Sequence, residues 1–349
     1  MRSDPERGTV LVGLDGGATK LAAHEVVVLA GEPVSLALGA GVAEERVPRG
    51  FAPVALDEQL AERESPRIDA LEREAGRAWV AAAARAIAGA AGGRRRLRLG
   101  VCMPGLKTAD ERGVCVLRHG PRMPRFTDEL EAELASLGFD LVAKIPRLIG
   151  DGEACGLGEL AADGGSFRGC AQAYYVGGGT GVAEAIVLDG VVRSLDSIGV
   201  PRAWELRRAG GECFEDLVSM KGINARAPGD AEALAEHVEE RAVAGERTAA
   251  RTLVAAAEAL AELVALRAES MLVLADGPRH LERVVVGQRT AALFTDVRLD
   301  AWFRGPLEHA LASRIARIAG SALPTGFLRA SRLRAAPAIG AAASARSAD

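Results

Sequence analysis

An acidic residue followed by a glycine pair is the first stretch of the chain whose residue types could do chemistry. Asp15 stands at the end of the strand-like run Val10–Leu14, and Gly16-Gly17 after it permit positive φ and close backbone approach. Amide groups in such a turn bind an anion, and a carboxylate beside them can hold Mg²⁺, usually through water. Alternation restarts in Thr19–Ala23, so an ordinary hairpin with an Asx-type turn explains the stretch equally well.

A second turn of the same design lies far along the chain. Ala173–Val176 reads as a strand, Gly177–Gly181 as a glycine-rich turn, and Val182–Leu188 as a returning strand that ends in the hairpin signal Asp189-Gly190. A dinucleotide-binding turn would need a helix directly after its glycines, and the P-loop pattern GxxxxGK[ST] does not occur. Two such turns in one chain favour phosphate binding over two unrelated hairpins.

Another carboxylate stands where a buried strand runs into a helix. Ile145–Ile149 reads as the strand, Asp151 lies in the short turn, and Glu153–Glu159 begins a helix of small residues. A strand end that delivers a carboxylate to a helix start is a usual place for catalytic groups in α/β folds. Taken alone, the pattern favours the alternative that Asp151 only caps the helix.

Length and composition narrow the classes of function. A chain of 349 residues predicts two domains of conventional size, and a net charge of −4 with one basic triplet, Arg94–Arg96, predicts no nucleic-acid partner. The polar start Met1–Gly8 and the lack of an apolar run of roughly 20 residues predict a cytoplasmic protein with no signal peptide and no membrane partner. The five cysteines form no CxxC pair, so neither a disulfide framework nor a structural zinc site is expected.

Periodicity indicates which elements position these residues. Residues 39–69 read as an irregular insertion or a mobile lid, and strand 97–103 ends in Pro104-Gly105. Thr127 is expected to cap a helix over 127–137. The other expected elements are strands at 25–30, 34–38 and 281–287 and helices at 70–91, 211–220, 231–243, 249–271, 306–318 and 335–345.

Taken in order, these motifs resemble the superfamily of sugar kinases, actin and chaperone ATPases, and within it the ROK family of bacterial sugar kinases. Gly150–Glu159 aligns without gaps on the family segment Asn-Asp-Ala-Asn-Ala-Ala-Ala-Leu-Gly-Glu. The other matches are Asp15–Lys20 with the first phosphate motif, Gly100–Gly105 with the strand that closes in Pro-Gly near the sugar, Gly177–Leu188 with the second phosphate motif, Val284–Gly287 with the strand and glycine that meet the adenosine, and Ile339–Ala342 with the closing helix.

The resemblance implies an α/β, two-domain actin-like ATPase fold of the ribonuclease H-like type with an interdomain cleft. The smaller domain is expected over residues 1–125, with a C-terminal helix at about 335–349 packed back on it. The larger domain, 126–334, is expected to carry the catalytic Asp, the second phosphate motif and the adenosine-binding region. ATP, Mg²⁺ and a homodimer follow from the same resemblance.

The resemblance also implies a role for each matched residue. Asp151 is expected to act as general base on the acceptor hydroxyl, and Asp15 to hold Mg²⁺ through water. The ATP phosphates are expected at Asp15, Gly16, Gly17, Ala18, Thr19, Lys20, Gly178, Gly179 and Thr180, the adenosine at Gly287 and Gln288, and the acceptor at Pro104, Gly105, His119, Gly150, Asp151, Glu153 and Glu205.

Departures from the family pattern bear on the acceptor. The zinc-site segments Gly-Glu-x-Gly-His and Cys-x-Cys-Gly-x-x-Gly-Cys are missing, and only Cys213 stands in that region, so no zinc is expected. Glu153 and Gly150 replace two Asn residues, and an ionised carboxylate only accepts hydrogen bonds where an amide also donates. The acceptor pocket is therefore rebuilt, which favours an unusual hexose-like acceptor such as a C7-cyclitol of secondary metabolism over glucose.

Two other classes of function remain beside the kinase. Family members that are sugar-responsive repressors suggest a non-catalytic sugar sensor, although those proteins carry an N-terminal helix-turn-helix that the residues before Val10 are too few to form. An acyl-CoA reductase activator ATPase of the same superfamily would need cysteines for a subunit-bridging cluster, and none is suitably spaced.

Overall fold

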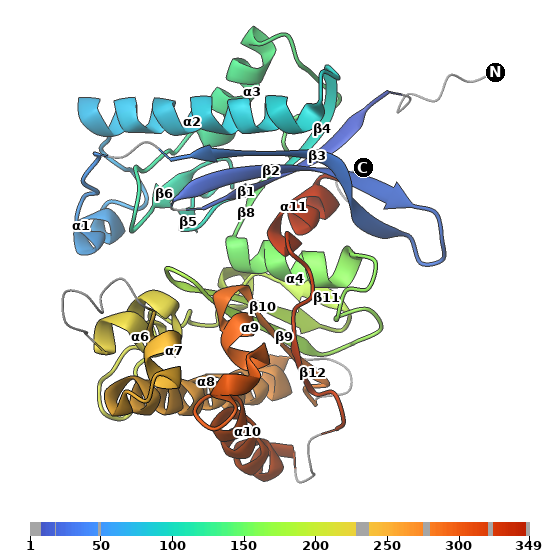
Figure 1. Cartoon of the computed structure of the whole chain (residues 1–349). Coiled ribbons are helices and arrows are strands. Elements are labelled where there is room, and N and C mark those ends of the chain that lie inside the picture. Colours follow the sequence, from blue (N-terminus) through green and yellow to red (C-terminus); the bar gives the residue numbers. More distant parts are fainter. Residues whose placement is uncertain are drawn as a thin grey trace. The chain divides into compact units, whose positions relative to one another are not determined.

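Figure 1 shows the computed structural model of the chain, which describes residues 8–17, 19–47, 50–227, 237–274, 280–319 and 324–346. The chain divides into two compact units. Unit 1 comprises Met1–Gly165 with Leu333–Asp349, and unit 2 comprises Ser166–Arg332. No helix of the described part is long and apolar enough to cross a membrane.

Unit 1 is built on a six-stranded sheet in the order β3-β2-β1-β4-β7, with β8 also paired to β4. The first three strands are antiparallel neighbours, whereas β4 runs parallel to β1, β7 and β8. The strands are β1 (Val10–Gly16), β2 (Lys20–Leu29), β3 (Ser35–Arg46), β4 (Arg96–Cys102), β7 (Asp140–Leu141) and β8 (Leu148–Ile149), and β5 (Leu106–Lys107) with β6 (Val114–Val116) forms a separate ribbon.

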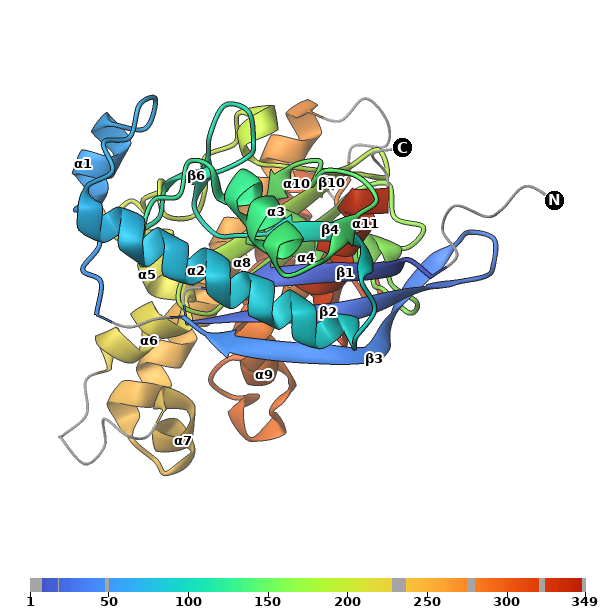
Figure 2. The same cartoon turned by 90° about the horizontal axis from the view of Figure 1, so that it is seen from above.

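Helices cover both faces of this sheet. α2 (Ala70–Ala91) lies across β1, β2 and β3, as the view from above shows (Figure 2). α11 (Ala336–Arg346) packs on the opposite face against β1 and β4 and against α4 (Asp151–Ala161) (Figure 1). The helices α1 (Leu56–Ala61) and α3 (Phe126–Ser136) complete the unit.

Glycines let the backbone of α11 contact the backbones of β4 and α4 directly. A Cβ on Gly100 of β4 would overlap the carbonyl oxygen of Ala341, and a Cβ on Gly340 would overlap the carbonyl oxygen of Ala154 in α4. Because no side chain fits at either position, these glycines set the spacing of α11, β4 and α4.

Unit 2 repeats the strand order of unit 1. Its sheet runs β11-β10-β9-β12-β13, with antiparallel β9, β10 and β11 and with β12 parallel to β9 and β13. These strands are β9 (Ala173–Gly178), β10 (Val182–Leu188), β11 (Val191–Arg193), β12 (Arg283–Gly287) and β13 (Leu328–Ala330). The helices are α5 (Phe214–Val218), α6 (Met220–Arg226), α7 (Val238–Val243), α8 (Arg247–Leu274), α9 (Gln288–Thr295) and α10 (Arg304–Ala319), with short 3₁₀ turns at Asp196–Ile198 and Val297–Leu299.

Several elements match the sequence-based expectation. α2 has the predicted bounds, and the predicted hairpin turn has its two residues in the left-handed region, with φ of 52° at Asp189 and 77° at Gly190. The mixed α/β class is confirmed. Of the predicted helix at 231–243, residues 231–236 lie outside the described residues, and α7 occupies the rest.

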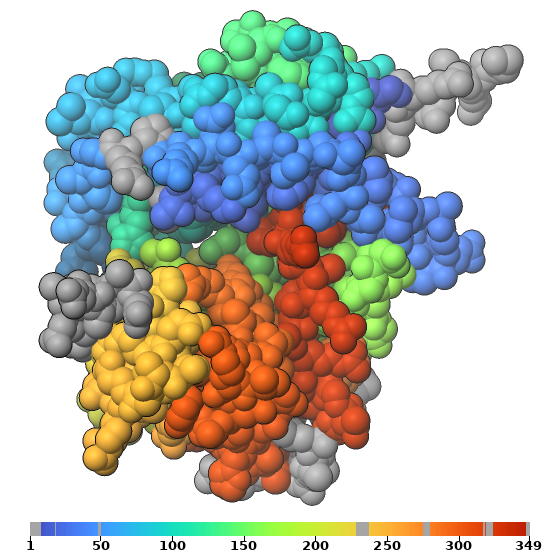
Figure 3. Space-filling view, in the orientation of Figure 1, coloured from blue at the N-terminus to red at the C-terminus, as the bar shows by residue number. Residues whose placement is uncertain are grey.

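Other expectations are wrong for identifiable reasons. Residues 39–69 are not irregular throughout, because β3 continues to Arg46 and α1 lies in the middle. The β2–β3 hairpin projects at the right of unit 1 (Figure 3).

Thr127 does not cap α3: its hydroxyl donates to the carbonyl of Arg112 at 2.9 Å, and Arg125 occupies the N-cap position. The helix expected at 211–220 is two helices that meet at Ser219.

The boundary between the units also differs from the division at residue 125. Residues 126–165 belong to unit 1, because β7 and β8 pair with β4 of the first sheet and α4 packs on α11. The base candidate Asp151 therefore lies in the same unit as Asp15.

Candidate active site

The carboxyl ends of three parallel strands meet at one edge of the unit 1 sheet. Asp15 of β1 is the register partner of Cys102 in β4, and Cys102 is also the partner of Ile149 in β8. Gly16 ends β1, the Pro104-Gly105 turn comes shortly after β4, and Asp151 comes shortly after β8. Three motifs that are far apart in the sequence therefore lie side by side, at the edge where α/β sheets place their ligands.

Asp15 is held in surroundings that oppose its ionisation. Burial, and then the charge of Asp151, raises the pKa of Asp15 to about 6, although the Cys102 thiol and the charge of Lys20 act the other way. Cys102 Sγ donates to Asp15 Oδ1 at 3.7 Å. The same burial and the nearby carboxylates raise the pKa of the Cys102 thiol, so it stays protonated and can donate.

The Asp15 carboxylate could hold Mg²⁺ through water. It supplies oxygen atoms, which Mg²⁺ prefers, and the charge of Asp151 reaches it. A divalent cation near Asp15 would favour the ionised carboxylate, against the burial and the charge of Asp151 that raise its pKa.

The first glycine turn is closed by its own backbone and by an ion pair. Gly17 N donates to the carbonyl of Lys20 at 2.9 Å, and Val47 N donates to the carbonyl of Thr19 at 3.2 Å. Lys20 Nζ lies 2.6 Å from Glu44 Oε1, with both side chains about half exposed. The predicted phosphate ligand Ala18 lies outside the described residues.

Asp151 begins α4. Gly150 occupies the N-cap position, so Asp151 is the first helical residue, and its Oδ1 accepts from Gly152 N at 2.9 Å. The negative charge at a helix start is favoured by the helix dipole. The capping alternative is therefore right that Asp151 binds an amide of the first turn, but wrong that Asp151 occupies the N-cap position. Asp151 also lies close enough to Asp15 for its charge to affect the pKa of Asp15.

Glu153, predicted to contact the acceptor, is held by a second charged residue. Its carboxylate is buried, at 8% exposure, and is bound by the guanidinium of Arg147, with Nη1 at 3.3 Å from Oε2 and Nη2 against Oε1. Arg147 Nη1 also lies 3.8 Å from Glu111. Arg147 was not predicted from the sequence, because its pairing with Glu153 depends on contacts that the folded chain forms.

The Pro104-Gly105 turn is organised around a lysine that sequence reasoning also missed. Gly105 has a φ of 87°, and Lys107 Nζ donates to the carbonyls of Met103 at 2.8 Å and Gly105 at 2.7 Å. The ammonium thus fixes the carbonyl directions of the turn that is expected near the acceptor.

His119 and Arg122 lie in one loop and differ in their roles. Arg122 is buried and pairs with Glu72 at 2.7 Å and Glu62 at 2.8 Å, so it ties the loop to α2 and to the end of α1. His119 is partly buried and lines a cavity of about 670 Å³ in unit 1, together with Lys20 of the first glycine turn. His119 therefore stays a candidate for acceptor contact.

In unit 2, the second glycine turn and the predicted adenosine residues lie on adjacent strand ends. Gly287 of β12 is the register partner of Gly177 in β9, and Gln288, with a φ of 52°, bridges to Gly178. Thr290, not predicted, accepts at Oγ1 from Gly178 N at 2.8 Å.

Further contacts shape the same turn. Gly179 N donates to the carbonyl of Gly181 at 2.9 Å, and Lys221 N donates to the carbonyl of Gly179 at 3.2 Å. Thr180 is exposed at the tip. The turn is therefore held from β12, from α9 and from α6, while its tip faces solvent.

Glu205 is the one predicted acceptor residue that belongs to unit 2. It is exposed, and its Oε2 accepts from the backbone N of Arg202 at 2.8 Å. The other acceptor candidates all belong to unit 1.

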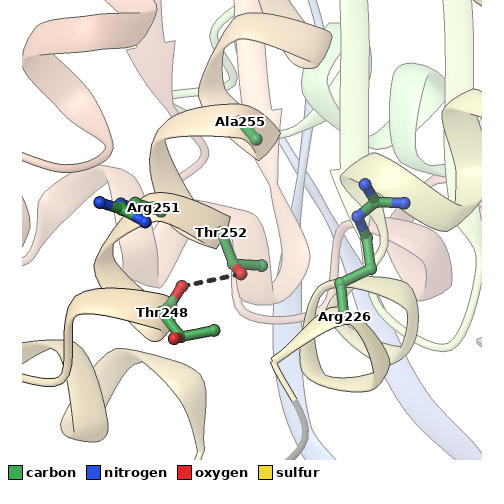
Figure 4. A pocket seen from close by; sticks show the side chains of 5 residues that line it. All are labelled: Arg226, Thr248, Arg251, Thr252 and Ala255. Carbon is green, nitrogen blue, oxygen red and sulfur yellow. Dashed lines mark hydrogen bonds between the residues drawn. The ribbon is translucent and has the colours of Figure 1, made fainter. Parts of the chain in front are cut away.

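A smaller cavity of about 320 Å³ lies between α6 and α8 of unit 2 (Figure 4). Thr252 Oγ1 donates to the carbonyl of Thr248 at 2.9 Å, and Arg226 on the facing helix pairs with Glu212 at 2.5 Å. None of its lining residues is a predicted site residue. Among the described residues, no group of three or more His, Cys, Asp and Glu is arranged to hold a metal ion.

Comparisons with solved structures identify the fold. The structure matches a ROK family glucokinase from Streptomyces griseus, solved in complex with glucose and AMPPNP, with a TM-score of 0.61 and 18% identity over 95% of this chain and 98% of that chain. It matches a ROK hexokinase from Thermus thermophilus with a TM-score of 0.55 and 21% identity over 96% and 97% of the two chains. No protein-family model and no curated protein matches the sequence.

A regulator has the same fold. A ROK family transcriptional regulator, a homologue of the E. coli MLC protein, matches with a TM-score of 0.56 and 14% identity over 98% of this chain and 78% of that chain. These likenesses confirm the predicted actin-like ATPase fold, and at such identities they bear on the fold alone.

Proposed function

We propose that this protein is an ATP-dependent kinase that phosphorylates a hydroxyl on a hexose-like ring, either a sugar or a carbasugar such as a C7-cyclitol. The observation that carries the proposal is the register of β1, β4 and β8, which brings Asp15 and Asp151 to one sheet edge beside the Pro-Gly turn. The fold shared with a glucokinase that binds glucose and an ATP analogue supports it.

In this reaction Asp151 is the general base. The acceptor hydroxyl oxygen bonds to the γ-phosphorus, the bond to the bridging oxygen of ADP breaks, and the hydroxyl proton passes to the Asp151 carboxylate and then to solvent. Mg²⁺, when bound, neutralises charge on the phosphates, and Asp15 would hold it through water. The second glycine turn, at Gly178, Gly179 and Thr180, would lie against the phosphates, with Gln288 near the adenosine.

The acceptor surroundings support a substrate other than glucose. Because both oxygens of Glu153 face the Arg147 guanidinium, Glu153 offers less to a sugar hydroxyl than the Asn it replaces. Gly150 has no polar side chain, and a Cβ there would meet nothing within 4 Å. A ring that lacks or relocates one hydroxyl group fits this arrangement, which is why we retain the cyclitol within the proposal.

The experiment is ADP release over a panel of hexoses, amino sugars and cyclitols, with Asp151→Asn measured beside the wild type. We expect kcat to fall by about 10²–10⁴ in the variant because the hydroxyl loses its proton acceptor. Asp140→Asn, an exposed carboxylate of the same unit, is the matched control and should be unchanged. An Asp151→Asn rate within tenfold of the wild type would refute the base assignment.

A second candidate is a non-catalytic sugar sensor of the same fold. The closed first turn favours it, because the amide of Gly17 already donates to Lys20 and the Lys20 ammonium already pairs with Glu44. A sugar that raises the melting temperature while no compound in the panel yields ADP would support the sensor and reject the kinase.

We further infer a cytoplasmic homodimer without a nucleic-acid partner. Light scattering would test the homodimer, and a DNA-binding assay would test the lack of a nucleic-acid partner.

A further inference from the structure

The cavity of about 670 Å³ in unit 1 has walls of two kinds. Phe51, Trp79 and Pro121 give it an apolar side, on which Trp79 is almost fully buried and Phe51 is partly exposed. The end of β3, which carries Glu44 and Glu45, gives it a charged side. All residues that line it belong to unit 1.

The charged side retains capacity to accept hydrogen bonds. Glu44 pairs with Lys20 through Oε1 at 2.6 Å, and Glu45 pairs with Arg85 through Oε2 at 3.2 Å. A carboxylate has about four acceptor sites, so each keeps lone pairs for a ligand hydroxyl. Carboxylates that accept hydroxyls, together with an aromatic side chain that packs against C–H groups, suit a polyhydroxylated ring.

The cavity adjoins the first glycine turn of the proposed reaction centre. Thr19 and Lys20, which line it, belong to the turn that follows Asp15, and Gly16 is the register partner of Leu21. His119, the acceptor candidate of the neighbouring loop, lines it too. The cavity therefore lies beside the turn that follows Asp15, whose strand ends at the same sheet edge as the strand before Asp151.

The cavity is larger than one ring requires. A hexose has about twelve non-hydrogen atoms, and even at the roughly 30 Å³ that each water occupies in the liquid it would fill only about half of this volume. Pockets that hold drug-sized ligands have volumes of about 300–1,000 Å³, and this cavity lies within that range.

Resting on the proposed function, we propose that this cavity holds a second polyhydroxylated ring of the acceptor, so that the substrate class is a two-ring compound, such as a disaccharide or a cyclitol glycoside. One ring presents its hydroxyl to Asp151, while the other packs on Phe51 and donates hydroxyls to Glu44 and Glu45.

The test is calorimetric binding to the wild-type protein without ATP. The one-ring probes are glucose, galactose and myo-inositol, and the two-ring probes are maltose, cellobiose and galactinol. We expect at least one two-ring compound to bind tenfold or more tightly than either of its rings. Phe51→Ala should remove that advantage and leave the one-ring affinity unchanged, whereas Phe51→Leu should retain part of it.

Two further variants keep the result interpretable. Glu45→Gln removes an anionic acceptor without removing the aromatic side and should also weaken two-ring binding selectively. Leu71→Ala removes an apolar side chain that is 71% exposed and does not line the cavity, so it should change nothing.

The inference is overturned if no two-ring compound binds, if one-ring compounds bind as tightly, or if Phe51→Ala weakens both classes equally. Failure of the kinase proposal gives a different result. Two-ring binding that depends on Phe51, with no ADP released from any of the six probes, leaves the cavity assignment standing and rejects the phosphorylation.

Discussion

At the scale of single residues, the two carboxylates of the candidate site lie in different surroundings. Burial and the charge of Asp151 raise the pKa of Asp15, while the hydrogen bond from the Cys102 thiol lowers it. Asp151 instead accepts a hydrogen bond from the amide of Gly152. The two residues therefore suit different roles, Asp15 beside a cation and Asp151 as a proton acceptor.

The raised pKa of Asp15 has a consequence for stability in metal-free buffer. Because the folded state binds the proton more tightly than the unfolded state, whose Asp titrates near 3.9, this stabilising contribution is complete below about pH 4. It is lost as pH rises through about 6, and it amounts to about 3 kcal/mol at most.

Urea unfolding in EDTA between pH 4 and pH 7 would measure this effect. We expect Asp15→Asn to be more stable than the wild type at pH 7 and the difference to shrink toward pH 4. Titrating groups that do not interact with Asp15 cancel in that difference. Parallel curves for the two proteins, or a less stable variant at pH 7, would contradict the expectation.

At the scale of elements, the site depends on how helices hold glycine turns. Thr290 of α9 accepts a hydrogen bond from the buried amide of Gly178, so the helix that follows β12 fixes the second turn. Thr290→Val should cost about 1–3 kcal/mol of stability, because a buried N–H loses its acceptor.

Thr290→Val should also weaken the binding of an ATP analogue, as calorimetry would show. Thr295 offers a matched control on the same helix, since it is exposed and its hydroxyl donates to Ala291. Equal effects of Thr290→Val and Thr295→Val on nucleotide affinity would argue against a role of this turn in binding phosphate.

The packing of α11 leads to another prediction at this scale. Gly340→Ala would drive a methyl group into the Ala154 carbonyl at the start of α4, and we expect a loss of about 1–3 kcal/mol in unfolding free energy. Arg346→Ala, exposed on the same helix, should stay within about 0.5 kcal/mol. Chemical denaturation compares the two, and a neutral Gly340→Ala would mean that the helices separate at little cost.

The sequence sufficed for features that depend on local patterns. The strand-turn-strand units and the strand end before Asp151 follow from short runs of alternation and from glycine pairs. The length of β3 was hidden, because its residues alternate between half-buried and exposed and include Gly39 and Gly41. Arg147, Lys107 and Thr290 were missed since their roles depend on contacts formed by the folded chain rather than on periodicity.

At the scale of the whole molecule, the proposed machinery is divided between two units. Unit 1 holds the two carboxylates and the large cavity, and unit 2 holds the second glycine turn with Gln288. In the described part of the chain, the hydrophobic clusters of one unit include no residue of the other. The units should therefore respond separately to a change in either core.

Removal of residues 333–349 tests this separation. The truncation exposes the face of β1 and β4 that Ile339 and Ala341 now help to bury. We expect the calorimetric transition of unit 1 to move down by several degrees or vanish while that of unit 2 stays within a few degrees. A single transition that shifts as a whole would show instead that the two cores unfold together.

The late position of α11 in the chain also affects biosynthesis. The ribosome completes the strands of the first sheet early. The helix α11, which covers β1 and β4, emerges only after the whole of unit 2 has been made. During translation the apolar surface of the nascent sheet therefore stays exposed, which is the situation in which chaperones bind a growing polypeptide. The order of synthesis therefore makes the second unit the first that can finish folding.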